Sequence, residues 1–232
     1  MNRKSKKVGI LGGKGPEATV SLFEKIIQHT PVTCEEDHLR IIIDNYPATP
    51  KPSLAINGLG DNPVDAMVEG AKLLELAGVD FIVMPCNSAH YYLNEVSDKV
   101  EVPFISIIEE AVKYAKNLSL KKIGILATKG LLESGLYQDS LKSAGLVSCV
   151  TSETNQQNLM NGILTYKDSG DATLLSDQMD INIEQLISKG ADGVILGCTE
   201  LPLIAKDKNY KIIMLDTLDI LAKACVTEAL KD

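Results

Sequence analysis

With 232 residues, of which 45% are apolar, the chain is long enough for one large globular domain or two small ones. Its formal net charge of −8 provides no basic surface for nucleic acid or for an anionic membrane, so we expect neither partner. No apolar run approaches the roughly 18 residues that a spanning helix needs, and we expect a cytoplasmic protein.

Short apolar runs alternate along the chain with segments of helical period, which predicts repeated β-α units around parallel sheets. The expected strands, in chain order, are Val8–Leu11, Leu39–Asp44, Phe81–Met84, Phe104–Ile105, Ile123–Ala127, Val147–Val150, Gly193–Leu196 and Ile212–Leu215. The clearest helices are Pro16–His29, Val64–Ala77, Ile107–Lys116, Leu131–Ala144, Ala172–Lys189 and Thr217–Leu230. Because ligands of such sheets bind at the carboxyl ends of strands, we expect the site in the residues that follow the strands.

The segment from Asn45 to Pro63 is the longest piece without a helical or strand period. It contains four prolines and two glycines. Its length and its place after a strand favour an active-site loop, and a plain surface connection is the alternative.

The first strand is followed by Gly13-Lys14-Gly15-Pro16-Glu17-Ala18, which fits a loose dinucleotide-binding pattern. Pro16 has no backbone N–H to offer a pyrophosphate, and the acidic residue expected about 20 residues later is absent. A Walker A loop also fails, since Gly15 follows Lys14 where Ser or Thr should stand. We therefore expect a tight strand-to-helix turn that is able to hold a carboxylate.

Two sequence segments are repeated along the chain. Lys6–Gly15 is similar to Lys121–Gly130, and Gly78–Ser88 is similar to Gly190–Glu200. The repeat predicts an α/β fold of two pseudo-symmetric lobes, each a parallel-sheet sandwich, with the active site in the cleft between them. We expect the N-terminal lobe to contain residues 1–115 and 216–232, and the C-terminal lobe to contain residues 116–215.

Five cysteines and three histidines are the residues from which a disulfide framework or a metal site would be built. They are Cys34, Cys86, Cys149, Cys198, Cys225, His29, His38 and His90. The cysteines include no C-x-x-C pair, and no histidine lies four residues from another. We therefore expect reduced thiols and no metal.

Cys86 and Cys198 each stand where an apolar strand gives way to polar residues. A buried cysteine is ordinarily a small apolar residue, and the other three keep that interpretation. A helix beginning at either of these two positions would favour the thiolate. His90, one helical turn beyond Cys86, would support that thiolate or a carboxylate, or lie on a solvated helix face. Glu200 would orient its neighbours, accept an ammonium group, or only complement a helix dipole.

Four motifs together resemble the aspartate/glutamate racemase family, and its aspartate racemase branch most closely. They are Gly12-Gly13-Lys14-Gly15-Pro16, Cys86-Asn87-Ser88-Ala89-His90, Leu126-Ala127-Thr128 and Gly197-Cys198-Thr199-Glu200. The resemblance implies a homodimer and a cofactor-independent racemisation of an amino acid. In it, one cysteine removes the α-proton and the other delivers a proton to the opposite face. Mapped by motif, Cys86 and Cys198 are these two bases.

The resemblance also implies which residues bind the substrate. The residues expected at the α-carboxylate are Asn87, Ser88, Thr128 and Thr199. Lys167 matches a family lysine that contacts the side-chain carboxylate, although a surface lysine at a helix end would look the same.

The chain departs from the family at two positions. The family loop Asn-x-Pro-x-x-Pro-Asp-Arg-Thr reads Asn45-Tyr46-Pro47-Ala48-Thr49-Pro50-Lys51-Pro52-Ser53, without the arginine. Lys14 stands where the family commonly has methionine. A distal carboxylate must then rely on Lys51, Lys167 or Lys14, and a lysine recognises a carboxylate less specifically than an arginine.

We expect an isomerase that interconverts L- and D-aspartate. A racemase of broader or glutamate specificity is the first alternative. Another carbanion-forming enzyme of the superfamily, such as a decarboxylase or isomerase, and a carboxylate-binding protein are the others.

Overall fold

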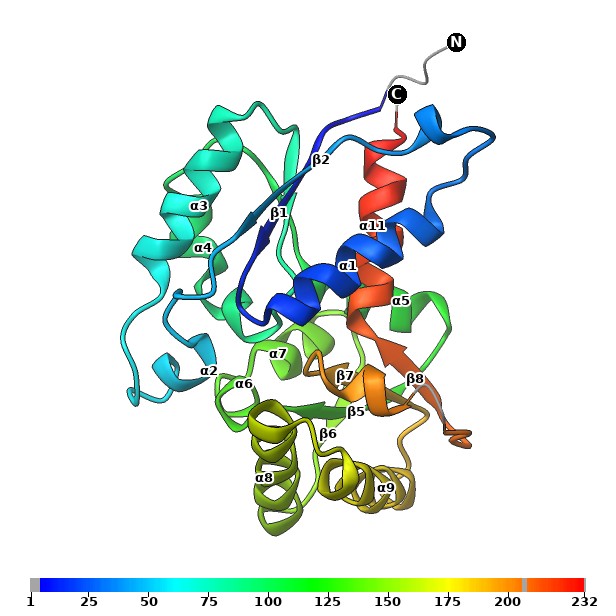
Figure 1. Ribbon diagram of the computed structural model, residues 1–232. Coiled ribbons are helices and arrows are strands. Elements are labelled where there is room, and N and C mark those ends of the chain that lie inside the picture. The colour runs from blue at the N-terminus through cyan, green and yellow to red at the C-terminus, as the bar shows by residue number, and fades with distance from the viewer. Residues whose placement is uncertain (1–4, 206–207, 232) are drawn as a thin grey trace. The chain divides into compact units, whose positions relative to one another are not determined.

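The computed structural model describes residues 5–205 and 208–231, which fall into two compact units. The first unit runs to Glu110 and resumes at Leu218, and the second comprises Ala111–Thr217. Each unit has its own sheet and its own core, which confirms the expected α/β fold class (Figure 1).

The sheet of the first unit has four parallel strands in the order β2-β1-β3-β4. These are β1 (Val8–Gly12), β2 (Ile41–Asn45), β3 (Phe81–Val83) and β4 (Phe104–Ile105). The residues of β1 and β3 are all buried, as expected of central strands that are covered on both faces. Apolar residues of α3 (Val64–Leu76), among them Met67, Ala71 and Leu74, form the core with Leu11 of β1 and Ile82 of β3.

The other helices of the first unit are α1 (Pro16–His29), the 3₁₀ turn η1 (Glu35–Asp37), α2 (Pro52–Ala55), the 3₁₀ turn η2 (Ser88–Tyr92), α4 (Leu93–Ser97), and parts of α5 (Ile107–Asn117) and α11 (Thr217–Ala229). Among these, α1, α5 and α11 were predicted, whereas the four short ones were not. The segment from Asn45 to Pro63 thus contains one short helix, α2.

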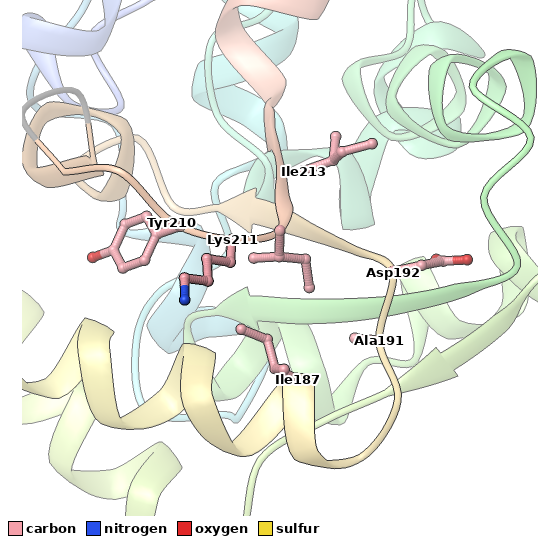
Figure 2. A pocket seen from close by; sticks show the side chains of 7 residues that line it. Ile187, Ala191, Asp192, Tyr210, Lys211 and Ile213 are labelled. Atoms are coloured by element: carbon pink, nitrogen blue, oxygen red, sulfur yellow. The ribbon is translucent and has the colours of Figure 1, made fainter.

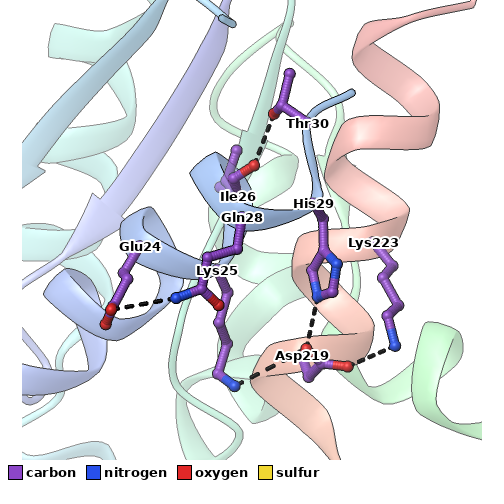
Figure 3. A network of polar contacts seen from close by, with 8 residues as sticks. All are labelled: Glu24, Lys25, Ile26, Gln28, His29, Thr30, Asp219 and Lys223. Carbon is purple, nitrogen blue, oxygen red and sulfur yellow. Dashed lines mark hydrogen bonds and ion pairs between the residues drawn. The ribbon is translucent and has the colours of Figure 1, made fainter. Parts of the chain in front are cut away.

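An acidic residue of α11 ties this C-terminal helix to α1 (Figure 3). Asp219 Oδ1 lies 2.6 Å from His29 Nε2 and 3.9 Å from Lys25 Nζ. Asp219 Oδ2 pairs with Lys223 Nζ at 2.7 Å. The end of the chain is thereby held to the first unit.

The second sheet repeats the first, with the order β6-β5-β7-β8. Its strands are β5 (Lys122–Ala127), β6 (Val147–Cys149), β7 (Gly193–Gly197) and β8 (Ile213–Asp216). Register is repeated too, since Val8 pairs with Phe81 and the equivalent Ile123 pairs with Gly193. The internal repeat seen in the sequence is therefore a repeat of structure.

Two helical segments of the second unit differ from expectation. The predicted single helix Leu131–Ala144 is wrong: α6 (Lys129–Glu133) and α7 (Leu136–Ser143) are separated at Gly135, whose φ of 73° does not continue a helix. The long helix α8 (Glu153–Ser169) was missed, because only three of its side-chain positions are buried and its composition is polar.

The helices α8, α9 (Thr173–Ser188) and α10 (Leu201–Ala205) complete this unit, and α8 packs along α9 (Figure 1). The boundaries of the other predicted strands and helices lie within about two residues of those observed. Across the described parts of the chain, we find no helix with the length and apolar character needed to cross a membrane.

Candidate active site

In the first unit, the carboxyl ends of β1 and β3 bring Lys14 and Cys86 to the same edge of the sheet. Ile10 pairs with Val83, so the residues that follow both strands leave the sheet side by side. The turn after β1 begins at Gly13, whose backbone N–H donates to Thr19 Oγ1 at 3.0 Å. Gly13 has a φ of 88°, and a Cβ there would lie 2.3 Å from the backbone of Tyr46. Only glycine fits this turn.

Lys14 is partly buried and turns back over its own strand. Its Nζ donates a hydrogen bond to the carbonyl oxygen of Gly12 at 2.9 Å. Burial lowers the pKa of Lys14, and electrostatic interactions with Cys86 and with Asp44 oppose that shift. The ammonium group therefore acts electrostatically on both of these residues. Asp44 was not among the expected site residues, although its place at the end of β2 is the signal that points to it.

His90 makes hydrogen bonds to two backbone groups, one of them that of Cys86, with its two ring nitrogens. Nδ1 donates to the carbonyl oxygen of Cys86 at 2.9 Å, and Nε2 accepts from the backbone N–H of Ile107 at 3.1 Å. This pattern requires the neutral ring, and burial lowers the pKa of His90 to about 4. His90 thus holds the backbone of Cys86, and the adjacent Asn87 and Ser88 are buried beside it.

In the second unit, the last paired residues of the central strands are Ala127 of β5 and Gly197 of β7. Thr128 and Cys198 follow them directly, so the sheet brings these two expected site residues together. Thr128 also caps α6, because its Oγ1 accepts from the backbone N–H of Leu131 at 3.4 Å.

Cys198 belongs to a chain of polar contacts that includes an acid and a cation. Its Sγ donates to Glu200 Oε2 at 2.8 Å, and Glu200 Oε1 pairs with Lys167 Nζ at 2.9 Å. Thr199 Oγ1 donates to Glu200 Oε2 at 3.3 Å. The structure thus brings Lys167 to three consecutive residues of the Gly197–Glu200 motif.

The electrostatics of this second cluster favour the neutral thiol. Burial raises the pKa of Cys198 well above its usual value, and the Glu200 carboxylate raises it further. Burial also opposes ionisation of Glu200, but Lys167 and the thiol's hydrogen bond hold the pKa of Glu200 below its usual range. An ionised Glu200 beside a protonated Cys198 is the consistent arrangement.

Lys51, another expected site residue, is exposed and precedes α2, and no contact described above joins it to either thiol cluster. The remaining cysteines also lie outside the two clusters. Cys34 is exposed, and burial raises the pKa of Cys225 to about 12. Cys149 pairs with Gly124, level with the middle of β5. The described residues contain no group of three or more His, Cys, Asp or Glu side chains that would hold a metal.

A shallow pocket of about 410 Å³ lies elsewhere in the second unit (Figure 2). Its lining includes Ile187 of α9, Asp192 just before β7 and Ile213 at the start of β8. These positions mark the amino ends of the strands, opposite to the end that carries Cys198. Because α/β sheets bind ligands at the carboxyl ends, we assign this pocket no part in the site.

Comparison with known proteins agrees with this geometry. A family model described as Asp/Glu/hydantoin racemase matches residues 11–225. A broad specificity amino-acid racemase of Bacillus subtilis is 29% identical over 226 residues, which make up 95% of this chain and 96% of that protein. The structure of Picrophilus torridus aspartate racemase has a TM-score of 0.85 and 29% identity, and the match covers 98% of this chain and 95% of that one. An aspartate racemase homologue from Pyrococcus horikoshii has a TM-score of 0.79 and 26% identity, with 97% and 100% covered.

The fold and these similarities define an isomerase of the racemase class. Within that class, the chain belongs to the Asp/Glu/hydantoin racemase family, whose model spans nearly its whole length. This result confirms the resemblance inferred from the four sequence motifs.

Proposed function

We propose that this enzyme interconverts L- and D-aspartate, with Cys86 and Cys198 acting on opposite faces of the α-carbon. The observation that carries the proposal is that both thiols follow equivalent central strands, β3 and β7, in two repeats of the same sheet. The similarity to Picrophilus torridus aspartate racemase supports the choice of substrate.

In the proposed reaction, the α-carbon of the substrate loses one proton and gains another. One cysteine, as the thiolate, takes the α-proton, and the electron pair of the C–H bond stays on the substrate. The other cysteine, as the thiol, gives its proton to the opposite face of that carbon. The mechanism assigns no step to a cofactor. For full activity it needs one thiolate and one thiol at once, which predicts a bell-shaped pH dependence of the rate.

The carbanion needs stabilisation through the α-carboxylate, for which preorganised hydrogen-bond donors are the available means. We assign this role to the polar residues next to the two thiols: Asn87, Ser88, Thr128 and Thr199. Closure of the proposed N-terminal lobe (1–115 and 216–232) on the C-terminal lobe (116–215) would exclude water from the substrate. We also propose that the enzyme acts as a cytoplasmic homodimer.

Lysine side chains are proposed to bind the distal carboxylate, in place of the missing arginine. Lys167 and Lys14 adjoin the two thiol clusters, whereas Lys51 is exposed. Because a lysine recognises a carboxylate less specifically than an arginine does, a broader amino-acid racemase is the second candidate. The similarity to the broad specificity racemase of Bacillus subtilis favours that candidate.

The test is incubation of the purified protein, without added pyridoxal phosphate, with L-aspartate in D2O. We expect α-deuterium by NMR and D-aspartate by chiral chromatography. Cys86→Ala and Cys198→Ala should each abolish racemisation, while Cys34→Ala, an exposed control, should keep it. Parallel incubations with L-glutamate and L-alanine separate the two candidates. Absence of exchange with all three amino acids would contradict both.

A further inference from the structure

The two repeats match in backbone but differ in the charge that each presents to its cysteine. In the sequence repeat, Lys14 is equivalent to Lys129, and Ser88 is equivalent to Glu200. The register of β1 with β3 and of β5 with β7 confirms this correspondence. Differences at these two pairs of positions change the charge beside each thiol.

The equivalent lysines point in different directions. Lys14 is partly buried, with its Nζ on the carbonyl oxygen of Gly12 and its charge acting on Cys86. Lys129 is exposed, and its Nζ lies 3.7 Å from Glu133 Oε1, one helical turn along α6. Only the first repeat thus places this cation near its thiol.

The acidic side chain, by contrast, is present only in the second repeat at this pair of positions. Glu200 accepts the hydrogen bond of the Cys198 thiol at 2.8 Å, whereas the first repeat has the uncharged Ser88 at that position. Among the described residues, Glu200 and Lys167 act electrostatically on Cys198, and Lys167 is already paired with the acid. The ionisable groups near Cys86 include Lys14, which also interacts with Asp44, and the neutral His90.

We propose that the enzyme without substrate holds Cys86 as the thiolate and Cys198 as the thiol, and that Lys14 and Glu200 set this order. The inference deepens the proposed two-base function and rests on it for its catalytic meaning. Lys14 and Glu200 act here as positioning residues, each through its cysteine. Asp44 contributes by keeping the ammonium of Lys14 charged.

One turnover reverses this arrangement. Cys86 gains the α-proton and Cys198 loses its own, so the enzyme is left with a thiol beside Lys14 and a thiolate beside Glu200. The thiolate is then repelled by Glu200, and Lys14 has lost the attraction of a thiolate. Both effects favour the transfer of a proton from Cys86 to Cys198 through solvent. The free enzyme would thereby return to the form that removes a proton with Cys86.

The experiment measures the rate of iodoacetamide alkylation of each cysteine against pH, without substrate, by mass spectrometry of the peptides. We expect Cys86 to reach its thiolate plateau at lower pH than Cys198. Lys14→Met should raise the Cys86 midpoint by about one pH unit, which slows its alkylation near neutral pH about tenfold. Lys14→Arg, which keeps the charge, should largely restore it. Lys129→Met, the matched control from the other repeat, should leave both midpoints unchanged.

A single shared midpoint for the two thiols, or a Cys86 midpoint that does not respond to Lys14→Met, would overturn the proposal. If Lys14 served only to bind substrate, this assay would show no change, because substrate is absent. The assay is also independent of racemisation. Ordered thiols in a protein that racemises no amino acid would refute the proposed function alone.

Discussion

The thiol of Cys198 donates a hydrogen bond to the carboxylate of Glu200 at 2.8 Å, two residues further along the chain. The same carboxylate pairs with Lys167, which keeps it ionised and therefore available as an acceptor. An acid in this position retains the proton on the thiol, and this is the state that a proton donor to the substrate needs.

Replacing Glu200 with glutamine should therefore make the enzyme lose activity at a lower alkaline pH than the wild type does. Glu200 raises the pKa of Cys198, so its loss lowers that pKa and the second thiol ionises at lower pH. We expect the alkaline limb of the kcat/KM profile to move down by about one pH unit. Measurement of aspartate racemisation between pH 6 and pH 10 checks this. An unchanged alkaline limb would show that Cys198 is not the proton donor on that limb.

The turn at Gly13 should be essential for stability. Gly13→Ala adds left-handed backbone strain and a clash with the backbone of Tyr46, and should destabilise the protein by about 3 kcal/mol or more. Gly145→Ala is the matched control, because Gly145 has a similar φ of 80° with no atom within 4 Å of the added Cβ. It should cost about 1 kcal/mol. Urea unfolding of both variants measures the difference, and equal losses would contradict the clash.

Much of the fold was readable from the sequence because its strands are short apolar runs and its two halves repeat. The helix Pro16–His29 and the strand Phe104–Ile105 occur as predicted. Amphipathic period did not reveal Gly135 as a helix break, since its effect depends on a positive φ. The spacing of apolar residues also did not predict the helix Glu153–Ser169, because few of its positions are buried.

The positions of the two thiols were also readable, because strand ends determine them. The directions of the side chains were not. Lys14 and Lys129 occupy equivalent positions in the repeated segment. Lys14, however, turns back onto the carbonyl oxygen of Gly12, whereas Lys129 pairs with Glu133 at the surface. Contacts such as Glu200 with Lys167 depend on helix packing over long sequence separations, which a motif does not encode.

The contact between α1 and α11 should stabilise the first unit modestly. Asp219→Asn removes the carboxylate shared by His29 and Lys223 (Figure 3), and we expect a loss of about 1 kcal/mol because these groups are partly solvated. Asp65→Asn serves as control, since Asp65 is fully exposed at 3.9 Å from Lys99 and should cost almost nothing. Urea unfolding at pH 7 compares the two variants. Similar losses in the free energy of unfolding for both variants would show that the contact between α1 and α11 does not stabilise the protein.

His90 should make the protein less stable in mild acid. Burial lowers its pKa to about 4 in the folded state from the ordinary value of 6.5, so the unfolded chain binds the proton more readily. Above pH 6.5 the ring is neutral in both states and has no effect on the pH dependence. As the pH falls from 6.5 to 4, the unfolded state gains the proton first, and the free energy of unfolding should drop by up to about 3 kcal/mol.

Urea unfolding at pH 7.5, 5.5 and 4.5 measures this effect. His90→Gln cannot titrate and should lose this part of the pH dependence, although it should be less stable at pH 7.5 because a buried backbone contact is left unpaired. His38→Gln, at an exposed histidine, should behave like the wild type. A wild type and a His90→Gln variant with parallel pH dependence would mean that His90 carries a proton in the folded protein, against the two backbone contacts that require it to be neutral.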